Sequence, residues 1–333
     1  KTASDSYILW PAKVGAFSLV MGRHVCHQDT SDLPFSYLIE QQSTSYIVPG
    51  ANLKSVGTIR DAKKWPVRDG RRDPDRLDCI NCNLLSPYTI QKMFNGVRIL
   101  KELQQVSGEM SDVYAYMSGK IKRSSLKNGL RYYGMAIDKF LGNSLITRIM
   151  SADFRNLREL RRALAPDDSC GTGEWVDIAG MIAPKQAVEK LADDVECGVI
   201  RDADTLNARF AAIHDCYYDY EWTWACRAIS EHYGVHLDSV TVEQLFALIY
   251  KWKDSVTGLD ELVYEDARKE FSLNAMTSFG ADGDSWQREQ DFMQVRGSLF
   301  ESEPFVNSVK EHMRVKSALC EAAVRKIKSI CNS

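Results

Sequence analysis

From Ser86 onward, apolar residues recur every three or four positions, which is the pattern of amphipathic helices. Ser86 and Pro87 are typical of an N-cap followed by the first helical residue. Thr241 and Gln244 have the spacing of a capping box ahead of a further apolar run. We therefore expect a mainly α-helical domain over residues 86–333, which includes one long helix over 202–224 and a final helix over 306–327.

Residues 1–85 lack this pattern and show a spacing of six instead. Residues 14–19 form one complete hexad, with an aliphatic residue first, glycine second and serine fifth. Such a spacing is typical of a solenoid with three flat faces per coil, in which the aliphatic side chains stack along the axis. An ordinary antiparallel β segment is the alternative, because six is a multiple of the strand period of two. The aliphatic positions form two runs: Ile8, Val14 and Val20, then Ile47, Leu53 and Ile59.

Two such runs supply about two coils, which are too few to bury a core alone. The chain also opens with Lys1 and shows no signal-peptide pattern. We therefore expect further coils in upstream sequence.

An excursion over residues 24–46 separates the two runs and carries histidines and carboxylates. Loops on a rigid scaffold often hold functional residues. Histidine can accept a proton near neutral pH, and a carboxylate can orient it. We predict a base and its orienter among His24, His27, Asp29 and Asp32. Two alternatives stay open: His24, His27 and Asp29 could bind zinc or manganese, or the histidines could only cap backbone groups.

A basic stretch follows the second run, and seven of the seventeen residues at positions 60–76 are Lys or Arg. Such side chains could clamp phosphates while an indole stacks on a base or sugar. Four interleaved aspartates favour the alternative of an ion-paired turn. The candidate substrate-binding residues are Arg60, Lys63, Lys64, Trp65, Arg68, Arg71 and Arg72.

Nine cysteines are scattered along the chain, and only Cys79 and Cys82 lie close together in sequence. Their spacing suits zinc or redox chemistry, but no second pair accompanies them, so two buried free thiols are the favoured alternative. An odd, scattered set in a long chain indicates a reducing compartment. We therefore expect a cytoplasmic protein.

Composition narrows the classes of function. The 42 Lys and Arg residues nearly balance 45 Asp and Glu, for a net charge of −3. A nucleic-acid binder would normally show a basic excess. No stretch approaches the ~20 apolar residues of a transmembrane helix, so we expect no membrane partner either.

Five segments carry a resemblance to a known family: GAFSLVMGRH from Gly15, HQDTSDLPFSYLIE from His27, SVGTIRDAKKWPVRDGRRD from Ser55, NLLSPYTIQKMFNG from Asn83 and EFSLNAMTSFGADG from Glu270. The N-terminal part resembles the left-handed β-helix of hexapeptide-repeat transferases. The whole chain resembles the C-terminal half of a longer, uncharacterised bacterial family that joins such a β-helix to a helical region. The predicted fold class is therefore α+β, with the end of a left-handed β-helix over 1–85 and a helical domain over 86–333.

This resemblance implies a function in outline. Hexapeptide proteins are commonly trimeric acyltransferases that use acyl-CoA, or C-terminal halves of sugar nucleotidyltransferases. We therefore expect a transferase-like protein that acts on a sugar phosphate or nucleotide sugar, with His24 or His27 as base and acyl-CoA or a nucleotide sugar as co-substrate. The alternative is a non-catalytic module that self-associates through the β-helix into a homo-oligomer and binds a partner protein through the helical half.

Overall fold

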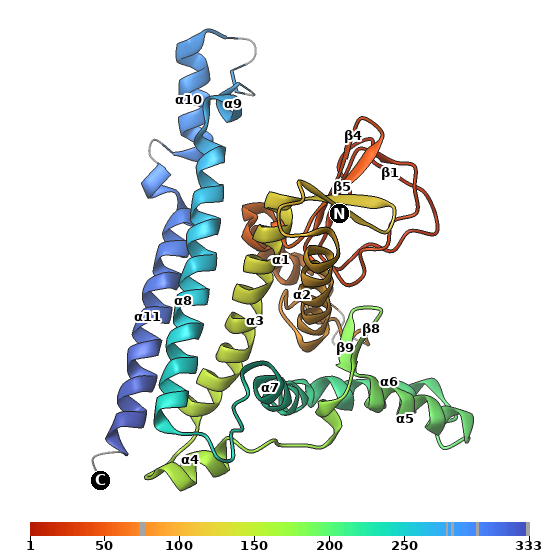
Figure 1. Cartoon of the computed structure of the whole chain (residues 1–333), viewed down its shortest axis with the longest axis vertical. Helices are drawn as coiled ribbons and strands as arrows, with labels where there is room; N and C mark the ends of the chain where they lie inside the picture. Colours follow the sequence, from red (N-terminus) through yellow and green to blue (C-terminus); the bar gives the residue numbers. More distant parts are fainter. Residues whose placement is uncertain (73–76, 278, 281–282, 298–299, 331–333) are drawn as a thin grey trace.

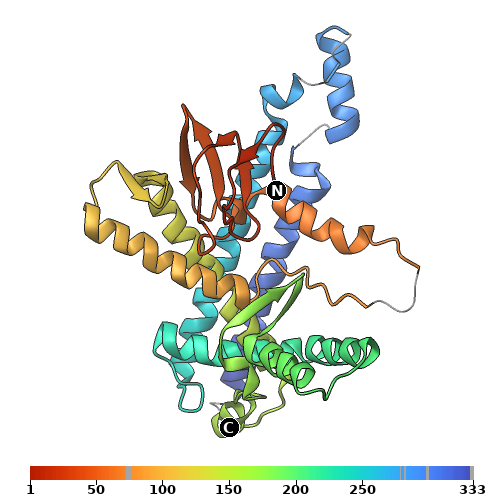
Figure 2. The same ribbon diagram turned by 90° about the vertical axis from the view of Figure 1, so that its right-hand side faces the viewer.

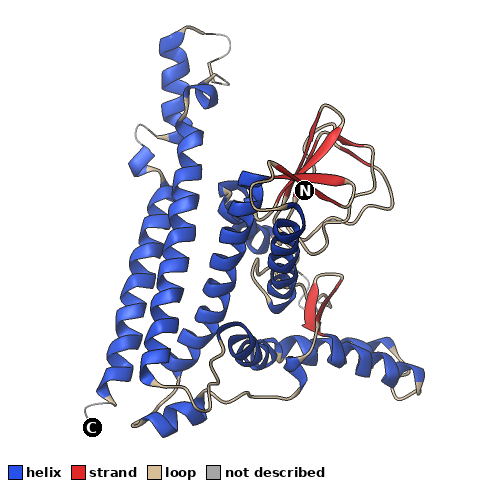
Figure 3. Ribbon diagram, in the orientation of Figure 1, coloured by secondary structure: helices blue, strands red, loops and turns tan. Residues whose placement is uncertain are grey.

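Short strands lie mainly at the N-terminal end of the chain, and long helices make up most of the rest of the computed structural model (Figures 1 and 3). The structure describes residues 1–72, 77–277, 279–280, 283–297 and 300–330.

Five strands form one mixed sheet in the order β2-β4-β5-β7-β6. β4 and β5 are an antiparallel hairpin whose two turn residues, Gln42 and Ser43, both have positive φ, as the hairpin's twist requires. β2 joins β4, and β7 joins β5, in parallel. The bounds of these strands are β2 Leu19–Met21, β4 Tyr37–Gln41, β5 Thr44–Val48, β6 Val113–Tyr116 and β7 Gly119–Lys122.

Two smaller sheets lie outside this one. β1 (Tyr7–Ile8) pairs in parallel with β3 (Arg23–His24), and β8 (Trp175–Ile178) forms an antiparallel hairpin with β9 (Met181–Pro184).

The helices are arranged around α3 (Arg123–Ser151), which packs against α2, α7, α8 and α11. α8 and α11 run antiparallel beside each other, and α9 and α10 lie beyond the end of this pair (Figure 1). The remaining bounds are α1 Val56–Arg68, α2 Pro87–Ser107, α4 Leu157–Ala163, α5 Lys185–Glu196, α6 Ala203–Asp215, α7 Tyr217–Tyr233, α8 Val242–Ala267, α9 Leu273–Met276, α10 Ser285–Arg296 and α11 Pro304–Ser329, with 3₁₀ turns η1 Ala51–Lys54, η2 Cys170–Thr172, η3 Arg268–Phe271 and η4 Phe300–Ser302.

The predicted left-handed β-helix was wrong, and the described residues contain no solenoid. Two of the six aliphatic positions, Val20 and Ile47, are buried in the five-stranded sheet, but Val14 is 37% exposed and Ile59 belongs to helix α1. The spacing of six arose because it is a multiple of the strand period, and because the second run continues from a strand through η1 into a helix.

The excursion at residues 24–46 contains strand β4 and part of β5, which occupy the middle of the five-stranded sheet. Leu33, Phe35 and Leu38 within it are completely buried. These apolar side chains were the signal in the sequence that this segment belongs to the core.

The helical character predicted for the C-terminal part agrees with the structure, and so do the predicted caps. Ser86 caps α2 with Pro87 as its first residue, and Thr241 and Gln244 form a capping box at α8. The helix expected over 202–224 is divided at Cys216 into α6 and α7. The strands β6 to β9 were not predicted from the sequence, and β6 and β7 complete the N-terminal sheet.

The packing of α8 against α3 depends on Gly142. A Cβ at this position would lie 2.3 Å from the Cβ of Trp252 and 2.4 Å from its Cδ1. Trp252 is 1% exposed, and its indole nitrogen donates a hydrogen bond to Asn143 Oδ1 at 2.9 Å. Glycine at 142 therefore lets the indole lie directly on the backbone of α3.

Gly142→Ala should lower the free energy of unfolding by about 1–3 kcal/mol, because the added methyl group overpacks the contact with Trp252. Chemical denaturation monitored by circular dichroism measures the change. Gly134→Ala, in the same helix, is the matched control, since a Cβ there meets nothing within 4 Å. The control should gain about 0.5–1 kcal/mol from helix propensity, and equal effects of the two substitutions would contradict the packing argument.

Candidate functional site

His24 belongs to strand β3 and is completely buried. Its Nδ1 lies 2.8 Å from Ser45 Oγ and its Nε2 lies 3.2 Å from the carbonyl oxygen of Met21. Burial lowers the pKa of His24, which favours the neutral ring. Because both ring nitrogens are hydrogen-bonded and shielded from solvent, the geometry supports a structural role for this residue and argues against a base that must reach a substrate.

The other three residues predicted for this site do not gather around a histidine. His27 is exposed. Asp29 accepts hydrogen bonds from the backbone and hydroxyl of Ser31, and Asp32 pairs with Lys92 at 3.1 Å. Within the described ranges, no three His, Cys, Asp or Glu side chains are grouped as a metal ion would require.

The basic stretch begins on helix α1 and continues beyond it, and the structure disperses its side chains. Lys63 alone of the seven lines the large cavity described below. Arg60 borders a smaller cavity beside Arg296. Arg71 forms ion pairs with two aspartates, Asp69 and Asp78, as the ion-paired alternative predicts. The remaining four are exposed: Lys64, Trp65, Arg68 and Arg72.

Cys79 and Cys82 are both free and partly exposed. Burial raises the pKa of the Cys79 thiol, and the nearby Asp215 and Asp78 act in the same direction. A raised pKa makes a thiol less reactive, so Cys79 shows no sign of redox activation.

None of the helices in the described part of the chain combines the length and the hydrophobicity that a membrane span requires.

A cavity of about 410 Å³ lies where α1 and the N-terminal region meet helices α3, α7, α8 and α11. About half of its lining residues are apolar, and the others include several ionisable side chains. This combination is typical of small-molecule sites. The apolar lining residues are Phe35, Leu53, Ile59, Leu84, Leu85, Phe140, Leu259, Val263 and Val309, and the polar ones are Lys63, Asn83, Lys139, Asn143, Ser144, Tyr218, Glu221, Asp260, Ser308 and His312.

Lys139 of α3 is the first unusual group of this cavity. Burial lowers the pKa of its amine, and Lys316 and Lys63 lower it further, while Asp260 acts in the opposite direction. Its ammonium group has no hydrogen bond or ion pair with any described residue. A half-buried cation without a partner among the described residues is costly, so the uncharged amine is favoured.

Glu221 of α7 is the second unusual group. Burial raises the pKa of its carboxyl to about 7, although the hydroxyls of Tyr217 and Ser144 favour the carboxylate. A carboxyl group with a pKa near neutrality can both donate and accept a proton under physiological conditions.

His312 and Asp260 form a close pair at the cavity wall, with His312 Nδ1 2.6 Å from Asp260 Oδ2. The aspartate side chain is 12% exposed, whereas that of His312 is 40% exposed. This contact orients the ring and leaves Nε2 free of any partner among the described residues. The pair has the geometry of a histidine with an orienting carboxylate, which is the arrangement predicted from the sequence for residues 24–46.

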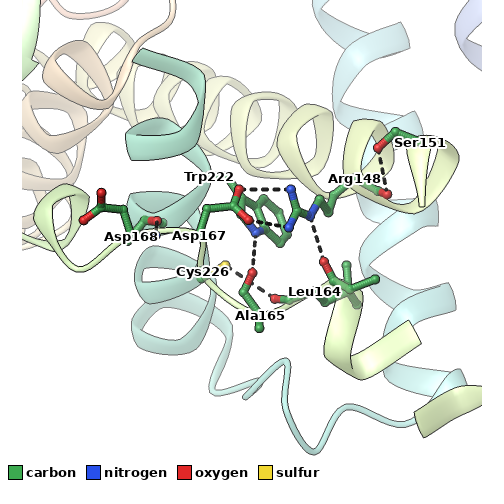
Figure 4. A network of polar contacts seen from close by, with 10 residues as sticks. Arg148, Ser151, Leu164, Ala165, Asp167, Asp168, Trp222 and Cys226 are labelled. Carbon is green, nitrogen blue, oxygen red and sulfur yellow. Dashed lines mark hydrogen bonds and ion pairs between the residues drawn. The ribbon is translucent and has the colours of Figure 1, made fainter. Parts of the chain in front are cut away.

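The position of α7, and with it Glu221, is fixed by a polar network (Figure 4). Arg148 of α3 forms an ion pair with Asp167 at 2.5 Å and donates to the carbonyl oxygen of Ala163 at 2.7 Å. Its guanidinium group lies over the ring of Trp222, whose indole donates to the carbonyl oxygen of Ala165. The network therefore holds residues 163–167, at the end of α4 and just after it, against α3 and against Trp222 of α7. Trp222 directly follows Glu221 in the sequence.

Of the ionisable residues that line the cavity, only Lys63 was a candidate from the sequence. His312 and Asp260 are 52 residues apart in sequence, so no local spacing connects them. One signal was present: Lys139 and Asn143 fall on the helix face that also carries the apolar Ala136 and Ile146. Polar side chains on a buried helix face require partners or a function.

Comparison with known proteins finds two matches. Residues 156–327, more than half of the chain, match a domain of unknown function (DUF6819), and residues 1–104 match a second domain of unknown function (DUF4954). No curated protein and no solved structure matches the chain. The cavity is lined by both matched segments and by α3 between them.

Glu221→Gln should change how the stability of the protein depends on pH. The folded pKa is about 7 and the ordinary value is 4.5, so the unfolded chain releases this proton first as the pH rises. The free energy of unfolding therefore falls by about 3 kcal/mol between roughly pH 4 and pH 7 on account of this group, and its contribution is constant above. Urea unfolding at several pH values should show that Glu221→Gln removes this loss.

Glu261→Gln is the matched control, because Glu261 is an exposed glutamate on α8. It should leave the pH dependence of the wild-type protein unchanged. The same slope in wild type and Glu221→Gln would contradict a raised pKa at position 221.

Proposed function

Since the chain belongs to the DUF6819 family, a domain of unknown function, we propose its function from the geometry of the cavity. The protein is a transferase-like enzyme that binds a phosphorylated sugar in this cavity and activates one of the sugar's hydroxyl groups for acyl or nucleotidyl transfer. The single observation that carries this proposal is the pairing of His312 with Asp260 at 2.6 Å in a cavity that is also lined by two lysines.

His312 serves as the base. Its Nδ1 is held by Asp260, so its Nε2 is available to accept the proton of a substrate hydroxyl. The same constellation of a nucleophile, a histidine and an orienting carboxylate activates hydroxyl groups in many acyl-transfer enzymes. Here the nucleophile is a hydroxyl group of the substrate.

Lys63 holds the phosphate. It extends from α1 to the cavity, and its ammonium lies 5.8 Å from the centre of the Phe305 ring. An ammonium group is a suitable ligand for phosphate oxygens. Because the pKa of Glu221 is about 7, that carboxyl group can be neutral when an anionic ligand enters, which limits electrostatic repulsion.

The donor, acyl-CoA or a nucleotide sugar, carries further phosphates. Lys64, Trp65 and Arg68 lie on the exposed continuation of the helix that carries Lys63. They offer cationic and aromatic surface for such a donor next to the cavity. The free cysteines of the described residues fit a reducing compartment, so we place this activity in the cytoplasm.

A second candidate is a partner-binding module that forms a homo-oligomer. The segment of α9 and α10 extends beyond the α8–α11 pair (Figure 2) and exposes the large apolar side chains Leu273, Trp286 and Val295. Exposed apolar surface of this kind favours contact with another protein.

A panel of sugar phosphates, nucleotide sugars and acyl-CoAs tests the first candidate by thermal shift. A ligand present at a hundred times its Kd adds about 2.7 kcal/mol to the free energy of unfolding. Lys63→Met should weaken binding of the active sugar phosphate by about 1.5–3 kcal/mol, roughly tenfold or more in Kd. His312→Asn keeps a donor for Asp260, so it should retain binding and lose turnover by about 10²–10⁴-fold.

His27→Asn is the matched histidine control and should leave turnover unchanged. Loss of turnover in this control would instead return the base to residues 24–46. The absence of a thermal shift with every member of the panel would reject the transferase and leave the partner-binding module.

A further inference from the structure

The proposed transfer chemistry does not use Lys139, although this cavity residue has an amine whose pKa is lowered by desolvation. It lies on the buried central helix α3, between Asp138 and the cavity-lining Phe140. Its neighbour Asp138 has other partners, since it accepts hydrogen bonds from Tyr233 and Ser255. The fold therefore brings an amine that has no ion-pair partner in the described part of the chain to the wall of a cavity large enough for a small molecule.

The groups around Lys139 favour a neutral, nucleophilic amine. Asp260, the carboxylate whose charge favours a protonated Lys139, already accepts a short hydrogen bond from His312. Two further cations, Lys63 and Lys316, lie near enough to lower the pKa of Lys139 after burial has done so. Lysines that are desolvated or placed beside other cations are activated in this way for imine chemistry.

We propose that Lys139 is a nucleophile that forms an imine with the carbonyl carbon of a small phosphorylated aldehyde or ketone, such as an open-chain sugar phosphate. This substrate class rests on the proposed function. Lys63 and Lys316 attract the phosphate of the ligand, while the apolar wall, which includes Phe140, excludes water from the reacting carbon.

The step balances without a further reactant. The lone pair on Lys139 Nζ attacks the carbonyl carbon, and the carbonyl oxygen takes a proton from the Glu221 carboxyl to give a carbinolamine. The Glu221 carboxylate then takes one proton from the nitrogen and returns it to the hydroxyl, which departs as water. The C=N bond forms as a protonated imine, and its nitrogen releases its remaining proton. His312 Nε2 can accept the proton released from nitrogen.

Pyridoxal 5′-phosphate is a suitable probe because it combines an aldehyde with a phosphate. The full chain is incubated with it near pH 7, the imine is reduced with cyanoborohydride, and labelled peptides are identified by mass spectrometry. We expect labelling of Lys139 to exceed that of Lys127, an exposed lysine of the same helix, by roughly tenfold or more, because desolvation favours the uncharged amine of Lys139. Pyridoxal, which lacks the phosphate, should label Lys139 less.

Two variants complete the test. Lys139→Met should lose the absorbance of the bound imine, whereas Lys127→Met, its matched control, should retain it. Because Lys139→Met could fail to fold, its melting curve is compared with that of wild type, and the peptide map of the wild-type protein gives an independent answer. Labelling spread over exposed lysines, with no preference for Lys139, would overturn the proposal.

The imine and the proposed transfer can fail separately. His312→Asn should lose turnover and still form the imine, only more slowly, because water can accept the proton that His312 would take. Selective labelling of Lys139 without a thermal shift from any sugar phosphate would support the imine and reject the transferase. A thermal shift from a sugar phosphate without labelling of Lys139 would reject the imine and support the transferase.

Discussion

Helix α3 is packed on most of its sides, by the N-terminal sheet and α2 on one side and by α7, α8 and α11 on the others. Two of its glycines allow this. A Cβ at Gly129 would lie 2.8 Å from the Cβ of Pro49, and Gly142 receives the indole of Trp252. Because protein interiors are packed as tightly as molecular crystals, α3 cannot shift without moving both of its neighbouring layers. The side chains that it presents to the cavity, among them Lys139 and Asn143, are therefore held in place by the core of the protein.

The charges in the cavity are a consequence of this position. A lysine and a glutamate on helices that surround the same space lose much of their hydration, and the pKa of each shifts toward the neutral form. Such groups lower the stability of the fold, and buried ionisable groups with shifted pKa values are concentrated at functional sites. The Arg148–Asp167 network, by contrast, stabilises the fold. Its charges are paired, and Arg148 also donates to a backbone carbonyl (Figure 4). The network thereby holds the helices that carry Lys139 and Glu221.

The cavity also links the two matched segments of the chain. Lys63 comes from the N-terminal segment, and Glu221, Asp260 and His312 come from the C-terminal one. The backbone N–H of Val56 at the start of α1 donates to Asp266 of α8 at 3.0 Å, which fixes the helix that carries Lys63 against the C-terminal helices. A site of this kind exists only when both segments are folded against each other.

Local signals in the sequence were enough to predict the helical C-terminal part and the ends of individual helices. The caps at Ser86 and Thr241 depend on side chains within three residues of the backbone groups that they satisfy, so sequence alone determines them. The spacing of six did not determine the N-terminal fold, because it suits alternating strands, a solenoid or the passage from strand to helix alike. Only tertiary packing decided that the strands form a mixed sheet. Packing also decided the site, since the side chains that meet there lie on separate helices and their pKa shifts arise from burial, which no local pattern of residues can specify.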